Sequence, residues 1–240
     1  MIRETSTNLI LDPRKGDSLS SEDFKLKMWF SRFGNFLKKH PNDNEFRGKM
    51  SDDSPDSFWN SRPLLLKRLD FIPQFWFHDE EVGKHIYHVV MNLGTSSIVD
   101  EPKSEIDRVK VIRATALLHD NGKRNDPSNP YHPIDSAQEV EQYLEWMGFN
   151  NKEKELCLRL IAYHDFLGKV ANPHTKETVD DLIKYFPTLA ELECLYFFTF
   201  ADIFSIKKMR LNMPNIFDNL TEVYKKARER IMREKKVNNI

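Results

Sequence analysis

The strongest constraint on the fold is an apolar segment over residues 104–120 that ends in a histidine and an aspartate. Hydrophobic residues recur around most of its helical surface, so this helix must be largely buried. They are Ile106, Val109, Val111, Ile112, Ala114, Ala116, Leu117 and Leu118. His119 and Asp120 end the segment, and burying such groups costs free energy unless each is paired or binds a metal. The interior of the protein is therefore expected to hold either a His–Asp hydrogen bond or a metal site.

Further helical patterns follow one another from about residue 63. Candidate helices cover residues 63–70, 82–94, 104–120, 134–147, 152–166, 176–185, 188–210 and 215–236. No Asn-Gly or Asp-Gly turn lies between alternating apolar runs, as a β-hairpin would require. The sequence therefore predicts an all-α protein, and 240 residues are enough for a core that needs no disulfide or structural metal to fold.

The first 60 residues are predicted to form an N-terminal extension to a helical domain over residues 61–240. Residues 1–20 are polar and indicate a loose arm, and residues 21–39 indicate an amphipathic helix. Its aromatic stripe is expected to pack on the main domain, although a basic amphipathic helix could also bind a membrane surface. The stripe comprises Phe24, Met28, Phe30, Phe33 and Phe36. Residues 41–60 are rich in Asp, Asn, Ser and Pro, which predicts a loop or linker.

Charge and cysteine content limit the possible partners and compartments. With 36 basic and 37 acidic residues, the net charge of −1 gives no general attraction to nucleic acid or membranes, so nucleic acid is a possible partner that nothing indicates. Cys157 and Cys194 lie far apart, which argues against a disulfide scaffold and favours a reducing compartment. The N-terminus lacks the pattern of a secretory signal, and no apolar run is long enough to span a bilayer. We expect a soluble, cytoplasmic protein.

Other ionisable residues also fall on apolar or helix-terminal positions. His85 lies within a predicted helix, and Asp202 lies inside the strongly apolar run over residues 195–204, where it must be paired or bound to a ligand. His132 lies at the start of one predicted helix, and His164 lies at the end of the next. Imidazole nitrogens and carboxylate oxygens are ligands for zinc, manganese, iron and magnesium-type ions.

In order and context these motifs resemble the HD-domain superfamily of metal-dependent phosphohydrolases. The similarity covers about residues 70–210 and implies an HD-domain helical bundle. Residues 85–89, His-Ile-Tyr-His-Val, are similar to the family's His-Ser/Thr-Leu-x-Val, and residues 117–123 are similar to its Leu-Leu-His-Asp-x-Gly-Lys. Asp202 follows Ala201, as in the family's Ala-Asp helix. One departure is Asn121, which stands where the family usually has an aliphatic residue.

The resemblance also implies a ligand set. A first divalent ion would be held by His85, His119, Asp120 and Asp202, and His132 and His164 occupy the places where two-metal subfamilies add histidines. One or two ions of manganese, magnesium, iron, nickel, cobalt or zinc are therefore expected, with Asp120 as the candidate bridge. His85 is favoured over His88 as the first ligand because Val89 then falls at the family's apolar position. His88 is instead expected to contact substrate.

The predicted reaction is hydrolysis of a phosphoester by a metal-activated water, as a phosphomonoesterase or phosphodiesterase. Asp120 and Lys123 are the expected catalytic residues. Lys123 and Arg124 together favour an anionic ligand, and Lys123 could reach the substrate phosphate as a point charge, although most loop lysines are solvated. The resemblance alone suggests a nucleotide, a cyclic nucleotide or an oligonucleotide end as substrate.

Two other functions remain open. Some members of the same superfamily use six His and Asp ligands to hold two irons and act as oxygenases, and this chain has all six residues. A non-catalytic, nucleotide-binding regulatory module would retain the metal site for structure or sensing.

Overall fold

The computed structural model describes residues 20–74, 78–98, 104–124 and 126–238, and these residues form twelve α-helices and two short 3-10 helices without any strand. The all-α prediction is confirmed. The predicted arm over residues 1–20 lies outside the described residues except for its last one. The α-helices are α1 (Ser21–Lys39), α2 (Asp43–Met50), α3 (Leu64–Lys67), α4 (Val82–Asn92), α5 (Arg108–Leu118), α6 (His132–Trp146), α7 (Asn151–Ala162), α8 (Phe166–Ala171), α9 (Val179–Tyr185), α10 (Leu189–Ser205), α11 (Lys207–Asn212) and α12 (Ile216–Asn238), and the 3-10 helices are η1 (Arg68–Phe71) and η2 (Asn121–Arg124).

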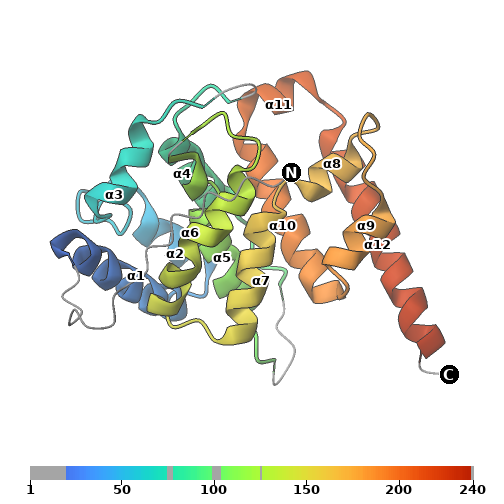
Figure 1. Ribbon diagram of the computed structural model, residues 1–240, viewed down its shortest axis with the longest axis horizontal. Helices are drawn as coiled ribbons and strands as arrows, with labels where there is room; N and C mark the ends of the chain where they lie inside the picture. The colour runs from blue at the N-terminus through green and yellow to red at the C-terminus, as the bar shows by residue number, and fades with distance from the viewer. Residues whose placement is uncertain (1–19, 75–77, 99–103, 125, 239–240) are drawn as a thin grey trace, which may run out of the picture.

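Helix α5 lies in the middle of the bundle, with α4, α6, α7 and α10 packed around it (Figure 1). The side chain of Asp107 caps its first turn by accepting a hydrogen bond from the backbone N–H of Lys110. Even its basic side chains are buried, because Lys110 pairs with Glu153 of α7 at 2.7 Å and Arg113 pairs with Asp43 at 2.8 Å. The prediction that this segment is buried over most of its surface is confirmed.

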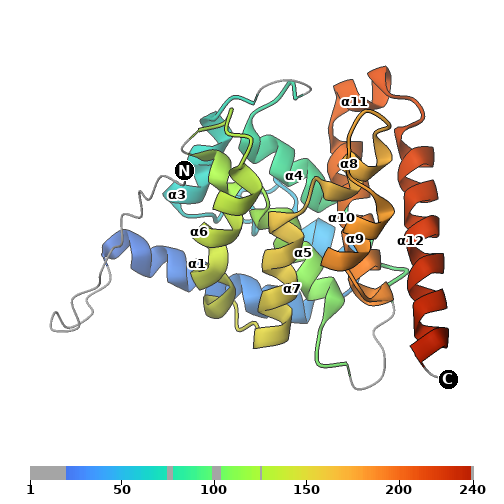
Figure 2. The same cartoon turned by 45° about the vertical axis from the view of Figure 1, so that its right-hand side comes forward.

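Helix α1 crosses the lower end of α6 in Figure 2 and contributes to the same hydrophobic core as the rest of the bundle. Its predicted stripe is partly wrong: Phe24 and Met28 are 55% and 47% exposed. The buried face is rotated from the predicted one, because successive turns bury Leu26, Trp29, Phe30, Phe33, Phe36 and Leu37. Helix α1 comes so close to α6 that a Cβ atom on Gly34 would lie 2.1 Å from the carbonyl oxygen of Met147.

The prediction of a loop over residues 41–60 is wrong in part, because α2 begins at Asp43. The Asn42 side chain caps this helix by accepting hydrogen bonds from the N–H groups of Asn44 and Glu45. Only Phe46 and Met50 of α2 are buried. A helix that buries so few side chains shows little hydrophobic periodicity, which explains the error.

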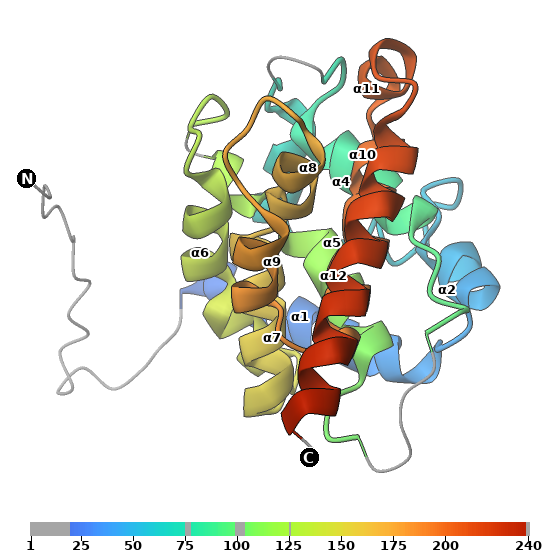
Figure 3. The same cartoon turned by 90° about the vertical axis from the view of Figure 1, so that its right-hand side faces the viewer.

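Two further elements differ from the prediction. The short helix α8 was not predicted, and the single helix expected over residues 188–210 is interrupted at Ile206, whose extended backbone separates α10 from α11. Helix α12 then runs along the outside of the bundle against α8, α9 and α10 (Figure 3). Within the described residues, no helix is both long enough and apolar enough to cross a membrane.

Candidate metal centre

The six predicted ligand residues come together from five segments of the bundle. Two groups form, and within each group one potential ligand atom per residue lies within 4.8 Å of the others. The first group comprises His85 of α4, His119 at the end of α5 and Asp202 of α10; the second comprises Asp120, His132 at the start of α6 and His164 after α7. All six side chains are largely or completely buried.

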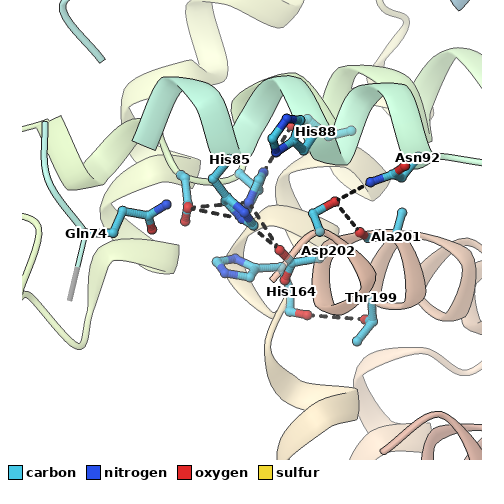
Figure 4. Close-up of polar contacts among 12 residues, drawn as sticks. Gln74, His85, His88, Asn92, His164, Thr199, Ala201 and Asp202 are labelled. Atoms are coloured by element: carbon cyan, nitrogen blue, oxygen red, sulfur yellow. Dashed lines mark hydrogen bonds and ion pairs between the residues drawn. The ribbon is translucent and has the colours of Figure 1, made fainter. Parts of the chain in front are cut away.

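In the first group, helices α4 and α10 face each other. His85 Nε2 lies 2.9 Å from Asp202 Oδ1, and His119 Nε2 lies 3.7 Å from the same oxygen. A hydrogen bond of 3.0 Å from Asn92 to Ser205 joins the two helices further along (Figure 4). Figure 4 also shows His164 beside Asp202, so the two groups adjoin.

Asp120 belongs to the second group and also faces the first. Its Oδ2 atom is 3.5 Å from His119 Nε2 and 3.8 Å from His85 Nε2, whereas its Oδ1 atom is 3.3 Å from His132 Nε2. One carboxylate oxygen therefore faces each group, as a bridging ligand between two cations requires.

Three of the histidines are oriented by backbone carbonyls three residues earlier in the chain. The Nδ1 atoms of His119, His132 and His164 lie 3.0, 3.0 and 2.9 Å from the carbonyl oxygens of Ala116, Asn129 and Ile161. A carbonyl only accepts hydrogen bonds, so each Nδ1 must carry a proton, and in a neutral ring Nε2 then presents a lone pair. This is the tautomer in which imidazole binds metals, fixed by an outer hydrogen bond.

Whether these residues fit a cation depends on whether their lone pairs already accept hydrogen bonds. His119 Nε2, His132 Nε2 and Asp120 Oδ1 are buried and have no hydrogen-bond partner. The His–Asp hydrogen bond offered as an alternative to a metal is therefore absent between His119 and Asp120. When the His132 ring is neutral, the lone pairs of its Nε2 atom and of Asp120 Oδ1 instead face each other at 3.3 Å. Such an arrangement is costly without a positive charge between them, and a divalent cation would supply one.

The protonation states agree with this fit. Burial lowers the pKa of His119 to about 4, so the ring is neutral at neutral pH. Burial alone would raise the pKa of Asp120, but the adjacent Lys123 ammonium group holds that pKa well below its usual range. Neutral imidazoles and ionised carboxylates are the forms that bind metals.

Lys123 is part of the site and is not a solvated loop lysine. Its Nζ atom lies 2.7 Å from Asp120 Oδ2 and 2.8 Å from Gln74 Oε1, and its side chain is buried. An ammonium group has three hydrogens, so one remains for a substrate oxygen. No motif in the sequence marked Gln74, which lies outside any helix and enters the site only through this contact.

The loop after Asp120 packs tightly against the first turns of α6. A Cβ atom on Gly122 would lie 2.6 Å from the backbone nitrogen of Ser136 and 2.7 Å from the carbonyl oxygen of His132. Glycine is therefore required for the close approach that brings His132 to Asp120. Asn121, the departure from the family pattern, is buried and donates a 2.7 Å hydrogen bond to Glu139 of α6.

Two predicted substrate contacts lie outside this cluster. His88 Nδ1 pairs with Glu80 Oε1 at 2.9 Å, and His88 lines a separate surface depression. Arg124 Nη2 pairs with Glu139 Oε2 at 3.1 Å. Neither residue lines the cavity above the metal centre.

His78 does line that cavity, although the sequence suggested no role for it. Its ring centroid lies 4.7 Å from that of His85, with the two rings nearly perpendicular. Its Nδ1 atom is buried without a hydrogen-bond partner, and burial lowers its pKa to about 3. His78 lies in an irregular segment, where no helical periodicity could indicate which way its side chain points.

The cavity has a volume of about 350 Å³ and opens directly over both groups of ligand residues. Ligand pockets in proteins commonly begin at this size. The chain matches no known family model and no curated protein.

Proposed function

We propose that the protein is a metal-dependent phosphohydrolase of the HD type, with two divalent cations bridged by Asp120. The observation that carries this proposal is the set of buried, partnerless lone pairs on His119, His132 and Asp120. The order of the ligand motifs along the chain, which is similar to that of the HD-domain superfamily, further supports it.

The residues of the chain have distinct roles in this proposal. A bound divalent cation would lower the pKa of a coordinated water and neutralise charge on a phosphoryl oxygen. Lys123, held by Asp120 and Gln74, directs its remaining N–H toward a phosphate oxygen and stabilises the negative charge there. The backbone carbonyls behind His119, His132 and His164 keep these rings in place, so little reorganisation accompanies binding.

The test is a phosphate-release screen over nucleoside mono-, di- and triphosphates, cyclic nucleotides and simple phosphomonoesters. The protein is loaded in turn with manganese, magnesium, nickel, cobalt or iron, and its metal content is measured. We expect metal-dependent release that Asp120→Asn abolishes together with part of the bound metal. His174→Gln is the matched control, because His174 is exposed and lies outside both groups. Absence of release with every metal, with an unchanged metal content in Asp120→Asn, would refute the proposal.

A second candidate, an oxygenase with two irons, is favoured by the composition of the donor set. Four histidines and two aspartates form two adjoining groups, a set that suits iron as well as other divalent ions. Anaerobic loading with iron followed by an oxygen-uptake assay separates the two reactions. Uptake without phosphate release would replace the first proposal with this one.

A further inference from the structure

The cavity above the metal centre has one apolar wall. Five hydrophobic side chains from the end of α10, from α11 and from the start of α12 line it: Ile203, Ile206, Met209, Met213 and Ile216. Histidine and aspartate side chains of the candidate metal centre line the same cavity. A ligand in this cavity therefore meets both these polar groups and apolar side chains.

Backbone hydrogen bonds connect the stretch that carries these side chains. Arg210 N–H donates to the carbonyl of Ile206, Met213 N–H to that of Met209, and Ile216 N–H to that of Met213. The five residues lie three or four positions apart along the chain, and all of them line the same cavity. The basic side chains of the same stretch, Lys207, Lys208 and Arg210, are exposed and do not line the cavity.

The two charged residues that line the cavity away from the candidate metal centre neutralise each other. Apart from Lys123 and the metal-binding groups, the charged residues among the described lining are Asp165 and Lys169. They form an ion pair of 2.7 Å with each other. Within the described lining, this part of the cavity therefore offers no unpaired cation to a second phosphate, which favours a ligand with a single phosphate.

The two methionines indicate what kind of apolar group fits. Met209 and Met213 are only partly buried, so their thioethers remain available to a ligand in the cavity. Methionine sulfur makes favourable contacts with aromatic rings and adapts to their shape. We propose that the substrate is a phosphomonoester of an alcohol with one uncharged aromatic ring system, whose ring packs on Met209 and Met213 while its phosphate lies beside Lys123. This inference rests on the proposed hydrolase function for its reaction, although not for its binding site.

The kinetic test compares three substrates: phenyl phosphate, adenosine monophosphate and glycerol phosphate. In the wild type we expect a KM about tenfold lower for an aromatic ester than for glycerol phosphate. Met209→Gln should remove this difference. Leu211→Gln is the matched control, because Leu211 lies on the same short helix, is 70% exposed and does not line the cavity. The phenyl and adenosine esters distinguish an aryl alcohol from a nucleoside as the source of the ring.

A binding measurement separates this inference from the proposed hydrolysis. Calorimetric titration of the metal-loaded protein with phenylphosphonate and methylphosphonate uses ligands that have no ester bond to hydrolyse. We expect phenylphosphonate to bind about tenfold more tightly, and Met209→Gln to equalise the two affinities. Equal affinities in the wild type would overturn the inference even if phosphate is released from esters. A phenyl preference that Met209→Gln removes would support the aromatic site even if no ester is hydrolysed. Preferred binding of an oligonucleotide end would also overturn it.

Discussion

Lys123 Nζ lies 2.7 Å from Asp120 Oδ2, the same carboxylate oxygen that faces His85 and His119. The lysine follows the aspartate by only three residues, within the turn formed by η2. The ammonium group of Lys123, proposed to bind phosphate, is therefore hydrogen-bonded to the carboxylate of Asp120, proposed to bridge the cations. A variant of the lysine alone therefore tests whether the proposed metal binding and the proposed phosphate binding are separate.

We expect Lys123→Met to retain the bound metal but to lower kcat/KM for phosphate release about 100-fold. The reason is that the variant removes a buried donor to the phosphate and leaves all six ligand residues in place. Metal analysis and steady-state kinetics on the same preparation check this. Arg124→Met is the control, because Arg124 pairs with Glu139 outside the cavity, and it should change the rate less than threefold. A loss of metal in Lys123→Met would contradict the separate roles.

The number of ions bound is a second prediction. Because Asp120, His132 and His164 form a group of their own, His132→Ala should lose about one of two bound ions while the group around His85 keeps the other. Elemental analysis of protein loaded with manganese measures the ratio of ions to protein. A ratio of one in the wild type, unchanged in His132→Ala, would show that the second group binds no ion.

Gly122→Ala tests the packing that positions His132. The added methyl group would collide with backbone atoms of His132 and Ser136, so the start of α6 must shift. A shift of about 1 Å in a catalytic site costs roughly 100-fold in rate, and we expect a loss of that order in phosphate release. Gly48→Ala is the matched control, because nothing lies within 4 Å of a Cβ atom there and helix propensity alone should stabilise α2 slightly. Equal activities in the two variants would refute the steric role of Gly122.

The pH dependence of stability depends in part on Asp43. Burial would raise its pKa, but hydrogen bonds from Thr95 and the charge and hydrogen bond of Arg113 outweigh this and lower it. A carboxyl whose pKa is lowered in the folded state contributes stability above its unfolded pKa of about 4, and this contribution is lost as pH falls through the folded pKa. Asp43→Ala should therefore reduce the free energy of unfolding by about 2 kcal/mol near pH 7.

Urea denaturation of the wild type and Asp43→Ala between pH 3 and pH 7 measures this contribution. The difference between the two proteins should be constant at neutral pH and should shrink below about pH 4. Asp53→Ala is the control, because this aspartate is exposed and bonds only to Ser51 nearby. A difference that grows as the pH falls would have the wrong sign for this mechanism.

The sequence predicted most of the helices from their apolar patterns, and it predicted from short motifs that six candidate ligand residues lie close together. Long helices such as α5 and α10 bury whole faces, so their apolar patterns are strong. The ligand residues were identified from short motifs and their order, and burial of ionisable groups at helix ends made a shared site plausible. The motifs could not predict how each imidazole ring is oriented. The orientation depends on hydrogen bonds to backbone carbonyls, such as the one from His119 Nδ1 to Ala116.

Other parts of the site could not be predicted, because they depend on contacts distant in sequence. Gln74 and His78 each lie outside the helices, and only the folded structure brings them to Lys123 and His85. Conversely, Arg124 is adjacent to Lys123 in sequence, yet its side chain extends to Glu139 on α6. The direction of a loop side chain follows from its tertiary partners, and neighbouring positions in a loop share no common face.

The six candidate ligand residues are distributed along the chain from His85 to Asp202 and belong to segments that meet only in the folded bundle. A cation held by both of these residues would act as a reversible cross-link that closes the intervening chain into a loop. Closing a long loop lowers the conformational entropy of the unfolded chain, as a disulfide does. Removing the ion with a chelator should therefore lower the free energy of unfolding of the entire bundle, including α1, which contributes no ligand residue.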